Sequence, residues 1–456
     1  MWEDIRSSLW FVPTVSFLVA AGAAVALIAL DRGPAGRAAA RLAWLFGGDA
    51  DSARYVLSTI ATSTLGVMGV TFSVTIVALN LSSTQFSPRM LHLFMRDRGV
   101  ETTMGVFIAT YAYALLVLRT VHGEGPGGEV GARFTPVIAT AGGMVFGLAS
   151  VGALIFFIHH IANSIQASNV IIQIGEETAP LLDRPFPAGV GAAFAGDGEA
   201  LAGRAFADVP SIDSGYVDYV DGEALLALAR KRDCVLRMEC GPGDFVAQGM
   251  PLAAVDPGDV ADAAFARAVA RCVVLGQEHT MQQDPEFGMQ QLMEIAVRAL
   301  SPAYNDPTTA MRCIDQLRVL LRRAAAREDP PALRADAEGR LRLIAKGPTF
   351  RTMLGRAINQ VRQDVAGDNA VTIRLLEVLR DVASAANDEA RRALLWEQAV
   401  ALLEASDARV PARRDREDID HAVRELAAVV GRDPTPVLLT REQRDLAASE
   451  KGGRMG

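Results

Sequence analysis

The chain has 456 residues, and half of them are hydrophobic, which is a high share for a water-soluble protein of this length. Its formal net charge of −8 argues against nucleic acid as the main partner. No CxxC pair or Cys/His spacing suits zinc, so we expect no metal site and no bound cofactor. The cysteines are Cys234, Cys240, Cys272 and Cys313.

Four apolar stretches occupy the N-terminal third of the chain. Each is long enough to cross a bilayer, whose hydrocarbon core needs about 20 helical residues. Helices are the expected spanning form, because lipid offers no partners for free peptide groups. We therefore predict a four-helix transmembrane domain over residues 1–162. Its spans run from Trp10 to Leu30, Val56 to Leu81, Thr102 to Val121 and Pro136 to Ile161.

The second span is rich in hydroxyl side chains and contains Gly66 and Gly69. Small and hydroxylated residues favour close helix packing, but they could equally line a path for water or ions. No Asp, Glu, Lys or Arg lies in the middle of any span, so the buried charge typical of a proton-coupled pump is missing. The residues that would line a path are Thr62, Ser63, Thr71, Thr75 and Asn80.

The segment between the second and third spans contains a helix start at Ser87-Pro88, because serine is a good N-cap and proline suits the first helical turn. An apolar run of methionine, leucine and phenylalanine follows, with Arg89 before it and Arg96 and Arg98 after it. This pattern indicates either an amphipathic helix at the membrane interface or a packed loop.

The fourth span carries Gly143 and Gly147 in GxxxG spacing, and His159 and His160 end it at the expected membrane interface. A seven-residue repeat then predicts that the helix continues as a stalk over residues 163–183. Such a stripe would be buried either by the soluble domain of the same chain or between the subunits of a homo-oligomer, which we favour. The repeat consists of Ile158, Ile165, Ile172 and Ala179.

An even number of spans places both termini on the same side of the membrane. Counting arginines in the loops does not decide which side this is. The cysteines form no disulfide framework and no export signal precedes the soluble part, so we expect a cytoplasmic domain in a bacterial inner-membrane protein. In an extracytoplasmic domain, Cys234 and Cys240 could pair.

Residues 184–260 are expected to form a small β-rich unit. Strand-like alternation at residues 214–220 and 234–238 flanks a helical pattern at residues 221–231. The sequence GDFVAQGMPL at residues 243–252 resembles the turn of barrel-sandwich hybrid domains, such as those of biotinyl and lipoyl carriers. The resemblance implies that Val246 and Leu252 face a small core. No lysine follows at the position that a carrier would modify, so a carrier role is not expected.

Residues 261–432 are expected to be mainly helical, and the tail at 433–456 is expected to be mobile. Together with the β-rich unit they make an α+β soluble domain. One strand of a hairpin is predicted at Leu341–Ile344. The predicted helices cover residues 287–300, 307–326, 351–364, 372–386, 389–404 and 415–430.

The sharpest local motif is RALSPAYNDPTTA at residues 298–310. Asp306 followed by Pro307 is typical of a helix N-cap and first turn, so local structure explains much of the motif. The alternative is a ligand or cation site at a helix N-terminus. Its residues would be Ser301, Tyr304, Asn305 and Asp306.

LSPAYNDPTTA, QDPEFGMQQLMEIA (residues 283–296) and SSTQFSPRML (residues 82–91) together resemble an uncharacterised bacterial membrane family, catalogued as domain of unknown function 2254. The resemblance extends from the first span to about residue 430. It implies an integral membrane N-terminal part and a cytoplasmic-type C-terminal part. It implies no activity, ligand or catalytic residue.

No GxSxG elbow, Walker loop, HExxH or dinucleotide-binding fingerprint is present, so we do not expect an enzyme. The favoured hypothesis is a channel- or transporter-like homo-oligomer in the lipid bilayer, with a soluble sensing or gating domain whose ligand is unknown. The first alternative is a membrane-anchored scaffold that binds a partner. The second is a membrane enzyme that uses the segment from Ser301 to Asp306.

Overall fold

A computed structural model of the chain describes residues 10–34, 50–85, 97–121, 135–164, 166–196, 203–365, 368–407, 410 and 412–439. Two compact units divide the chain, Met1–Asn169 and Val170–Gly456. The first contains four long apolar helices, and the second combines β-sheets with a helical C-terminal part, so the predicted fold class is confirmed.

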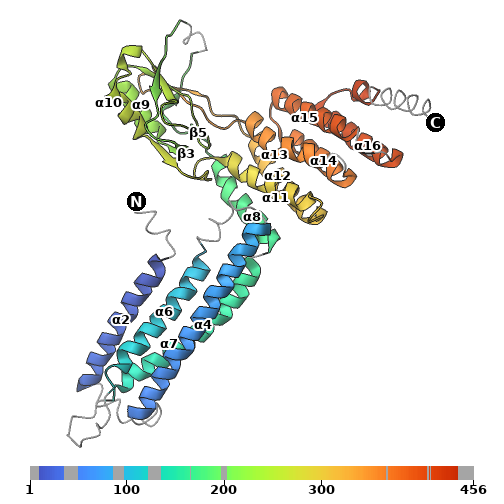
Figure 1. Cartoon of the computed structure of the whole chain (residues 1–456). Helices are drawn as coiled ribbons and strands as arrows, with labels where there is room; N and C mark the ends of the chain where they lie inside the picture. The colour runs from blue at the N-terminus through green and yellow to red at the C-terminus, as the bar shows by residue number, and fades with distance from the viewer. Residues whose placement is uncertain are drawn as a thin grey trace, which may run out of the picture. The chain divides into compact units, whose positions relative to one another are not determined.

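The four helices of the membrane unit are α2 (Phe11–Arg32), α4 (Ala50–Gln85), α6 (Arg98–Leu118) and α7 (Val137–Ser164) (Figure 1). All four are long and apolar enough to cross a bilayer, as the sequence predicts. α6 is the most enclosed of the four, and it packs against the other three. Tyr113 of α6 is fully buried, and its hydroxyl donates to the carbonyl oxygen of Ala139 at 2.7 Å.

The glycine pair of the fourth span, Gly143 and Gly147, packs against another helix of the same chain. A Cβ atom added at Gly143 would approach Leu57 of α4, and one added at Gly147 would contact Ile60. The GxxxG face therefore brings α7 close to α4 of the same chain. It gives no support to the expected homo-oligomer, which remains a prediction.

The predicted continuous stalk is wrong. α7 ends at Ser164, and a separate helix, α8 (Ala167–Thr178), is followed by the 3₁₀ helix η3 (Ala179–Leu182). The buried face of α8 is formed by Val170, Ile171 and Ile174, whereas Ile172 is exposed. Ile158 of the same repeat is exposed as well, and burial of the repeat between subunits remains a prediction. Ile165 lies outside the described residues, as do residues 86–96, which include the predicted helix start at Ser87-Pro88.

Two sheets form the β-rich part of the second unit. The larger has six strands in the order β1-β8-β9-β4-β6-β2, and all neighbours are antiparallel except β4 and β9. The smaller sheet, β5-β3-β7, is antiparallel. The strands are β1 (Ala192–Ala193), β2 (Ala207–Pro210), β3 (Gly215–Val220), β4 (Val235–Met238), β5 (Phe245–Val246), β6 (Pro251–Asp256), β7 (Val273–Gly276), β8 (Leu333–Ala335) and β9 (Leu341–Ile344).

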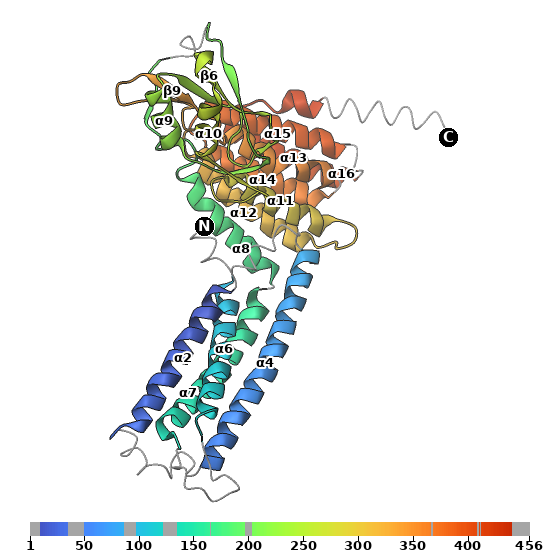
Figure 2. The same ribbon diagram turned by 60° about the vertical axis from the view of Figure 1, so that its left-hand side comes forward.

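Both sheets share one apolar core with α9 (Gly222–Lys231) and α10 (Ala263–Ala270) (Figure 2). Val246 and Leu252 are buried in this core, as the resemblance to a barrel-sandwich turn predicts. A short 3₁₀ helix, η5 (Gly258–Val260), leads into α10. The hairpin of β8 and β9 completes the larger sheet, although its residues follow two long helices in sequence.

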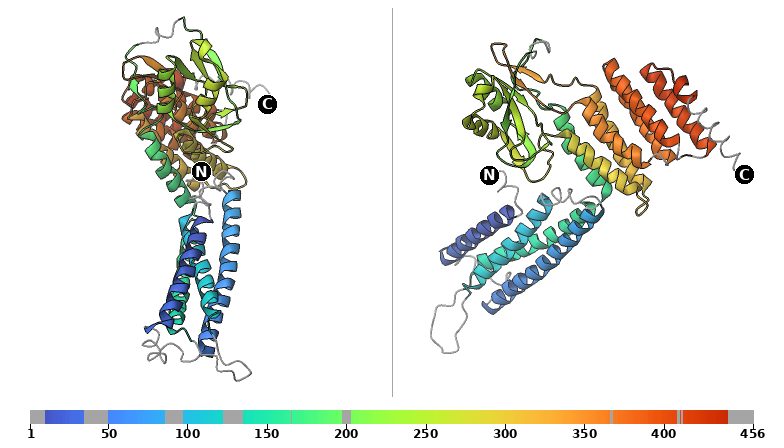
Figure 3. Two further views of the ribbon diagram at one scale, coloured as in Figure 1. Left: turned by 90° about the vertical axis from the view of Figure 1, so that its left-hand side faces the viewer. Right: turned by 45° about the horizontal axis from the view of Figure 1, so that its top comes forward.

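The helical part consists of α11 (Pro285–Leu300), α12 (Pro307–Ala325), α13 (Phe350–Val365), α14 (Asn369–Ala385), α15 (Glu389–Asp407) and α16 (Arg413–Val430), close to the predicted ranges (Figure 3). α11 packs against both α12 and α13, and α14 packs against α12, α15 and α16. α11 and α13 also form the walls of a cavity.

Candidate functional site

The five residues that the sequence assigns to a path do not share one face of α4. Thr71 is buried, and its hydroxyl donates to the carbonyl oxygen of Val67 at 2.9 Å. Thr75 is half-buried and donates to the carbonyl oxygen of Thr71 in the same way. The other three, Thr62, Ser63 and Asn80, are exposed within the single chain.

One exposed face of α4 carries a row of small and polar residues, interrupted by the exposed Ile76 and Val77 before Asn80, which we call the outer stripe. Its members recur every three, four or seven positions, so they lie on one side of the helix. A Cβ atom added at Gly66 or Gly69 would meet no atom within 4 Å, so this face is open in the single chain. The outer stripe consists of Thr59, Thr62, Gly66, Gly69, Ser73 and Asn80.

Two carboxylates that were not predicted as functional residues hold helix ends together in the membrane unit. Asp31, at the end of α2, accepts hydrogen bonds from the backbone N–H groups of Ile138 and Ala139 at 2.9 and 2.8 Å, and thereby caps α7. Asp97 caps α6 through the N–H of Gly99 at 2.8 Å. It also lies 2.7 Å from Nε2 of His160 on α7.

The predicted Ser301–Asp306 site forms the connection between α11 and α12. Asp306 is an N-cap, as predicted, because its carboxylate accepts from the N–H and the hydroxyl of Thr309 at 3.1 and 2.6 Å. These bonds hold the pKa of Asp306 below its ordinary value. The Ser301 hydroxyl donates to the carbonyl oxygen of Arg298 at 2.7 Å. Asn305 adopts a left-handed backbone with φ of +46°.

Tyr304 of the same connection is about half exposed, and the Arg298 guanidinium lies 6.0 Å from the centre of its ring. None of the four predicted residues lines the cavity described below. A ligand role for them remains a prediction, and their observed bonds are those of a helix-to-helix turn.

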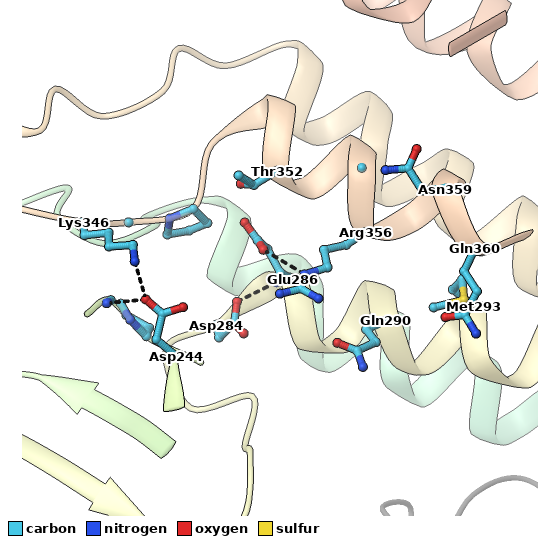
Figure 4. A pocket seen from close by; sticks show the side chains of 15 residues that line it. Asp244, Asp284, Glu286, Gln290, Met293, Lys346, Thr352, Arg356, Asn359 and Gln360 are labelled. Atoms are coloured by element: carbon cyan, nitrogen blue, oxygen red, sulfur yellow. Dashed lines mark hydrogen bonds and ion pairs between the residues drawn. The ribbon is translucent and has the colours of Figure 1, made fainter. Parts of the chain in front are cut away.

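A cavity of about 510 Å³ lies within the second unit (Figure 4). One wall is a face of α11 with Glu286, Gln290 and Met293, and the opposite wall is a face of α13. The α13 wall consists of Thr352, Gly355, Arg356, Asn359 and Gln360. Two loops close one end, formed by Gly241, Pro242 and Asp244 and by Lys346, Gly347 and Pro348.

The acidic and basic side chains of the cavity differ in depth. Asp284 and Glu286 are 7% and 16% exposed, whereas Lys346 and Arg356 are 54% and 57% exposed. Glu286 lies 3.6 Å from Nε of Arg356, which is long for an ion pair, and it accepts a hydrogen bond from Thr352. Burial raises the pKa of Glu286 above its ordinary value, and the nearby Asp284 raises it further.

Asp284 is held by several groups beneath the cavity. Its carboxylate accepts from the N–H of Glu286 at 2.9 Å, which caps α11, and lies 2.8 Å from Nε2 of His279. The His279 ring stacks on Phe287 with a centroid distance of 4.1 Å. Gly243, with φ of +86°, lies directly against this pair, where any side chain would collide with Asp284. These contacts fix the depth and direction of the Asp284 carboxylate.

At the rim, Lys346 lies 2.9 Å from Asp244, and its ammonium also donates to the carbonyl oxygen of Glu239 at 3.0 Å. In the part of the chain that the structure describes, no cluster of three or more His, Cys, Asp or Glu side chains could hold a metal ion. The cavity lining itself supplies amide and hydroxyl groups together with carboxylates and basic groups. The cavity has no signature in the sequence, because its walls come from segments that are far apart in the chain.

Comparisons with other proteins agree with this architecture. Uncharacterised proteins of Mycobacterium tuberculosis and Mycobacterium bovis are 29% identical to the chain over 438 residues, which is 95% of this chain and 82% of theirs. No solved structure matches the chain. The profile of a family described as predicted membrane protein (DUF2254) matches residues 6–381, as the sequence motifs imply. The chain therefore belongs to the DUF2254 family of membrane proteins.

Proposed function

We propose that the chain is a channel- or transporter-like homo-oligomer of the bacterial inner membrane, in which the outer stripes of α4 from several subunits face one another around a path. The soluble unit is cytoplasmic in this proposal and acts as a sensor or gate. The outer stripe is the observation that carries the proposal.

The exposed face of α7 provides the contrast that supports this interpretation. It carries large apolar side chains, including Val145, Leu148, Val151 and Ile155, which suit contact with lipid tails. The outer stripe of α4 instead offers two glycines, hydroxyl groups and the Asn80 amide to its surroundings. Small residues allow close approach of a second helix, and an amide in lipid is costly unless it is hydrogen-bonded.

The lack of a charged residue in the middle of the spans favours passive conduction over proton-coupled pumping. Backbone bonding reduces the cost of the hydroxyl groups, since Ser73 donates to the carbonyl oxygen of Gly69 at 2.9 Å. Each hydroxyl oxygen still has acceptor capacity, which water or a permeating solute can use. A stripe of this kind therefore serves both close helix packing and a wetted path.

Cysteine cross-linking in native membranes tests the arrangement. Gly66→Cys and Gly69→Cys should each give an oxidant-induced dimer, because copies of α4 face one another. Leu148→Cys on the lipid-facing side of α7 is the matched control and should remain monomeric. The unmodified protein reports any background from its own thiols. Cross-linking at Leu148 but at neither glycine would contradict the proposal.

Mass photometry in nanodiscs and a liposome flux assay complete the test. We expect an oligomer and a flux of small solutes that Thr62→Leu reduces. A protein that is monomeric in nanodiscs and in several mild detergents would overturn the shared path. An oligomer that conducts nothing would instead favour a membrane-anchored scaffold.

A further inference from the structure

The cavity between α11 and α13 places opposite charges at different depths. Its deep charged groups, Asp284 and Glu286, are both acidic, and its exposed charged groups include Lys346 and Arg356 at the rim. We propose that this cavity binds a small zwitterion, whose ammonium group lies at Glu286 and whose anionic group lies at Arg356. This site does not depend on the proposed path through the membrane.

Glu286 is the best acceptor for the ammonium group. Asp284 already has a hydrogen-bond partner at each oxygen, through the Glu286 N–H and His279. Asp244 accepts from the Gly241 N–H and from Lys346, both on one oxygen. Glu286 has the Thr352 hydroxyl and the distant Arg356 guanidinium. A buried carboxylate with such weak compensation favours a cationic partner.

Arg356 is the natural partner for the anionic end. An ammonium group that approaches Glu286 competes with the 3.6 Å contact between Glu286 and Arg356. The displaced guanidinium then needs a new acceptor, and a carboxylate or phosphate can bind it through two parallel hydrogen bonds. Asn359 lies three residues further along the same helix and also lines the cavity, so its amide can assist. One weak internal pair is thereby exchanged for two ligand pairs.

Other small ligands fit the cavity less well. A simple anion would approach Arg356 beside two buried carboxylates, which repel it. A metal ion finds no cluster of three suitable side chains in the part of the chain described here. A plain amine would pair with Glu286 but would leave the displaced Arg356 guanidinium without an acceptor. The volume of about 510 Å³ suits a small metabolite.

Two sources provide this zwitterionic chemistry, namely free amino acids and the amino-alcohol phosphate headgroup of a lipid. The full chain in nanodiscs would be titrated calorimetrically with L-alanine and with O-phosphoethanolamine at millimolar concentrations. Ethanolamine and inorganic phosphate are the single-charge probes. We expect heat and a raised melting temperature with at least one zwitterion. Neither single-charge probe should match it, and the better zwitterion identifies the source.

Variants at the two contact points define the site. Glu286→Gln and Arg356→Gln should each weaken zwitterion binding by about ten- to a hundredfold, the usual effect of losing a charged hydrogen bond. The controls are Glu397→Gln on α15 and Arg351→Gln on α13, which replace exposed residues outside the cavity and should bind as the unmodified protein does. Because Arg356 is exposed, its variant tests the site even where Glu286→Gln folds poorly.

Three results would overturn the inference. The first is the absence of binding by both zwitterions. The second is phosphate binding that Glu286→Gln strengthens, which would identify a simple anion site. The third is an equal loss of affinity in the control variants. Cross-linking and flux through the membrane unit are measured separately, so failure of one proposal is distinguishable from failure of the other.

Discussion

In the membrane unit, the carboxylates of Asp31 and Asp97 bind groups of the same unit. In the soluble unit, the Glu286 carboxylate lies beside a cavity. Asp31 caps α7 with both oxygens, and Asp97 binds the start of α6 and His160. Glu286 faces the cavity with a hydroxyl and a distant guanidinium. A carboxylate whose acceptor positions are filled by its own chain stabilises the fold, while one that is partly compensated beside a cavity is available to a ligand.

The largest effect is expected at Asp31. Asp31→Ala should lower the free energy of unfolding of the membrane unit by about 2 kcal/mol, because two N–H groups at the start of α7 lose a charged acceptor. Thermal unfolding in detergent measures the change. Asp51→Ala, which removes an exposed carboxylate in the first turn of α4, is the control. Equal losses in both variants would show that Asp31 does not act as a cap.

Asp97→Ala should cost about 1 kcal/mol, since it removes the cap of α6 and the partner of His160. A double-mutant cycle with His160→Ala separates the two roles. We expect the combined loss to be smaller than the sum of the single losses, because both variants break the same contact. Strict additivity would mean that the 2.7 Å contact contributes nothing to stability.

Asp306→Ala should also cost about 1 kcal/mol, and Pro307→Ala should cost less. The folded-state pKa of Asp306 is lowered, so its stabilising contribution is complete above the ordinary value of about 3.9 and is lost as the pH falls through the lower folded value. Acid-induced unfolding of the Asp306→Ala and Pro307→Ala proteins measures this loss of stability at low pH. A cellular phenotype that is lost at an unchanged melting temperature would instead indicate a ligand role for this loop.

The smallest change in stability is expected for Glu286→Gln in the protein without ligand. The folded-state pKa of Glu286 is raised above the ordinary value of 4.5, so the protonated carboxyl favours the fold and this contribution is lost as the pH rises through the folded value. Glu286→Gln should remove this pH dependence while Asp284, Arg356 and Thr352 remain as neighbours. A melting-temperature profile from pH 4 upward that is identical in both proteins would contradict it.

The same titration should affect binding in the opposite direction. An ammonium group prefers the ionised carboxylate, so zwitterion affinity should fall as the pH drops below the folded-state pKa of Glu286. Calorimetry at several pH values measures this, with Arg351→Gln as an unaffected control. A constant affinity across the acid range would show that Glu286 does not bind the ammonium group.

The spans and the long helices were predictable because their signals are local. Apolar length identifies the spans, and the capping pattern at Asp306-Pro307 places the start of α12 within one residue. The sheets were harder to predict from the sequence, since β4 pairs in parallel with β9, which lies more than a hundred residues further along the chain. Such a pairing leaves no trace in local periodicity. β7 and α10 were missed for a different reason, because elements of four and eight residues are too short to show a clear periodicity.

The cavity shows why the site was harder to predict than the fold. Asp284-Pro285 and Asp306-Pro307 are the same local signal, and both aspartates are N-caps with proline in the first turn. Only the packing of α13 against α11 places the first of them beside a cavity. Likewise, the hydroxyl content of the second span is visible in the sequence, but the outward direction of Thr62 and Asn80 depends on which face of α4 its neighbours cover.

The parallel pairing of β4 with β9 has a consequence for synthesis of the chain. The ribosome completes β4 by Met238, but its partner strand ends only at Ile344, after α11 and α12 have been made. During that interval one edge of β4 has no strand to bond, and a free strand edge invites pairing with other chains. A transcript cut before codon 344 should therefore leave this edge of β4 unpaired and favour aggregation of the product.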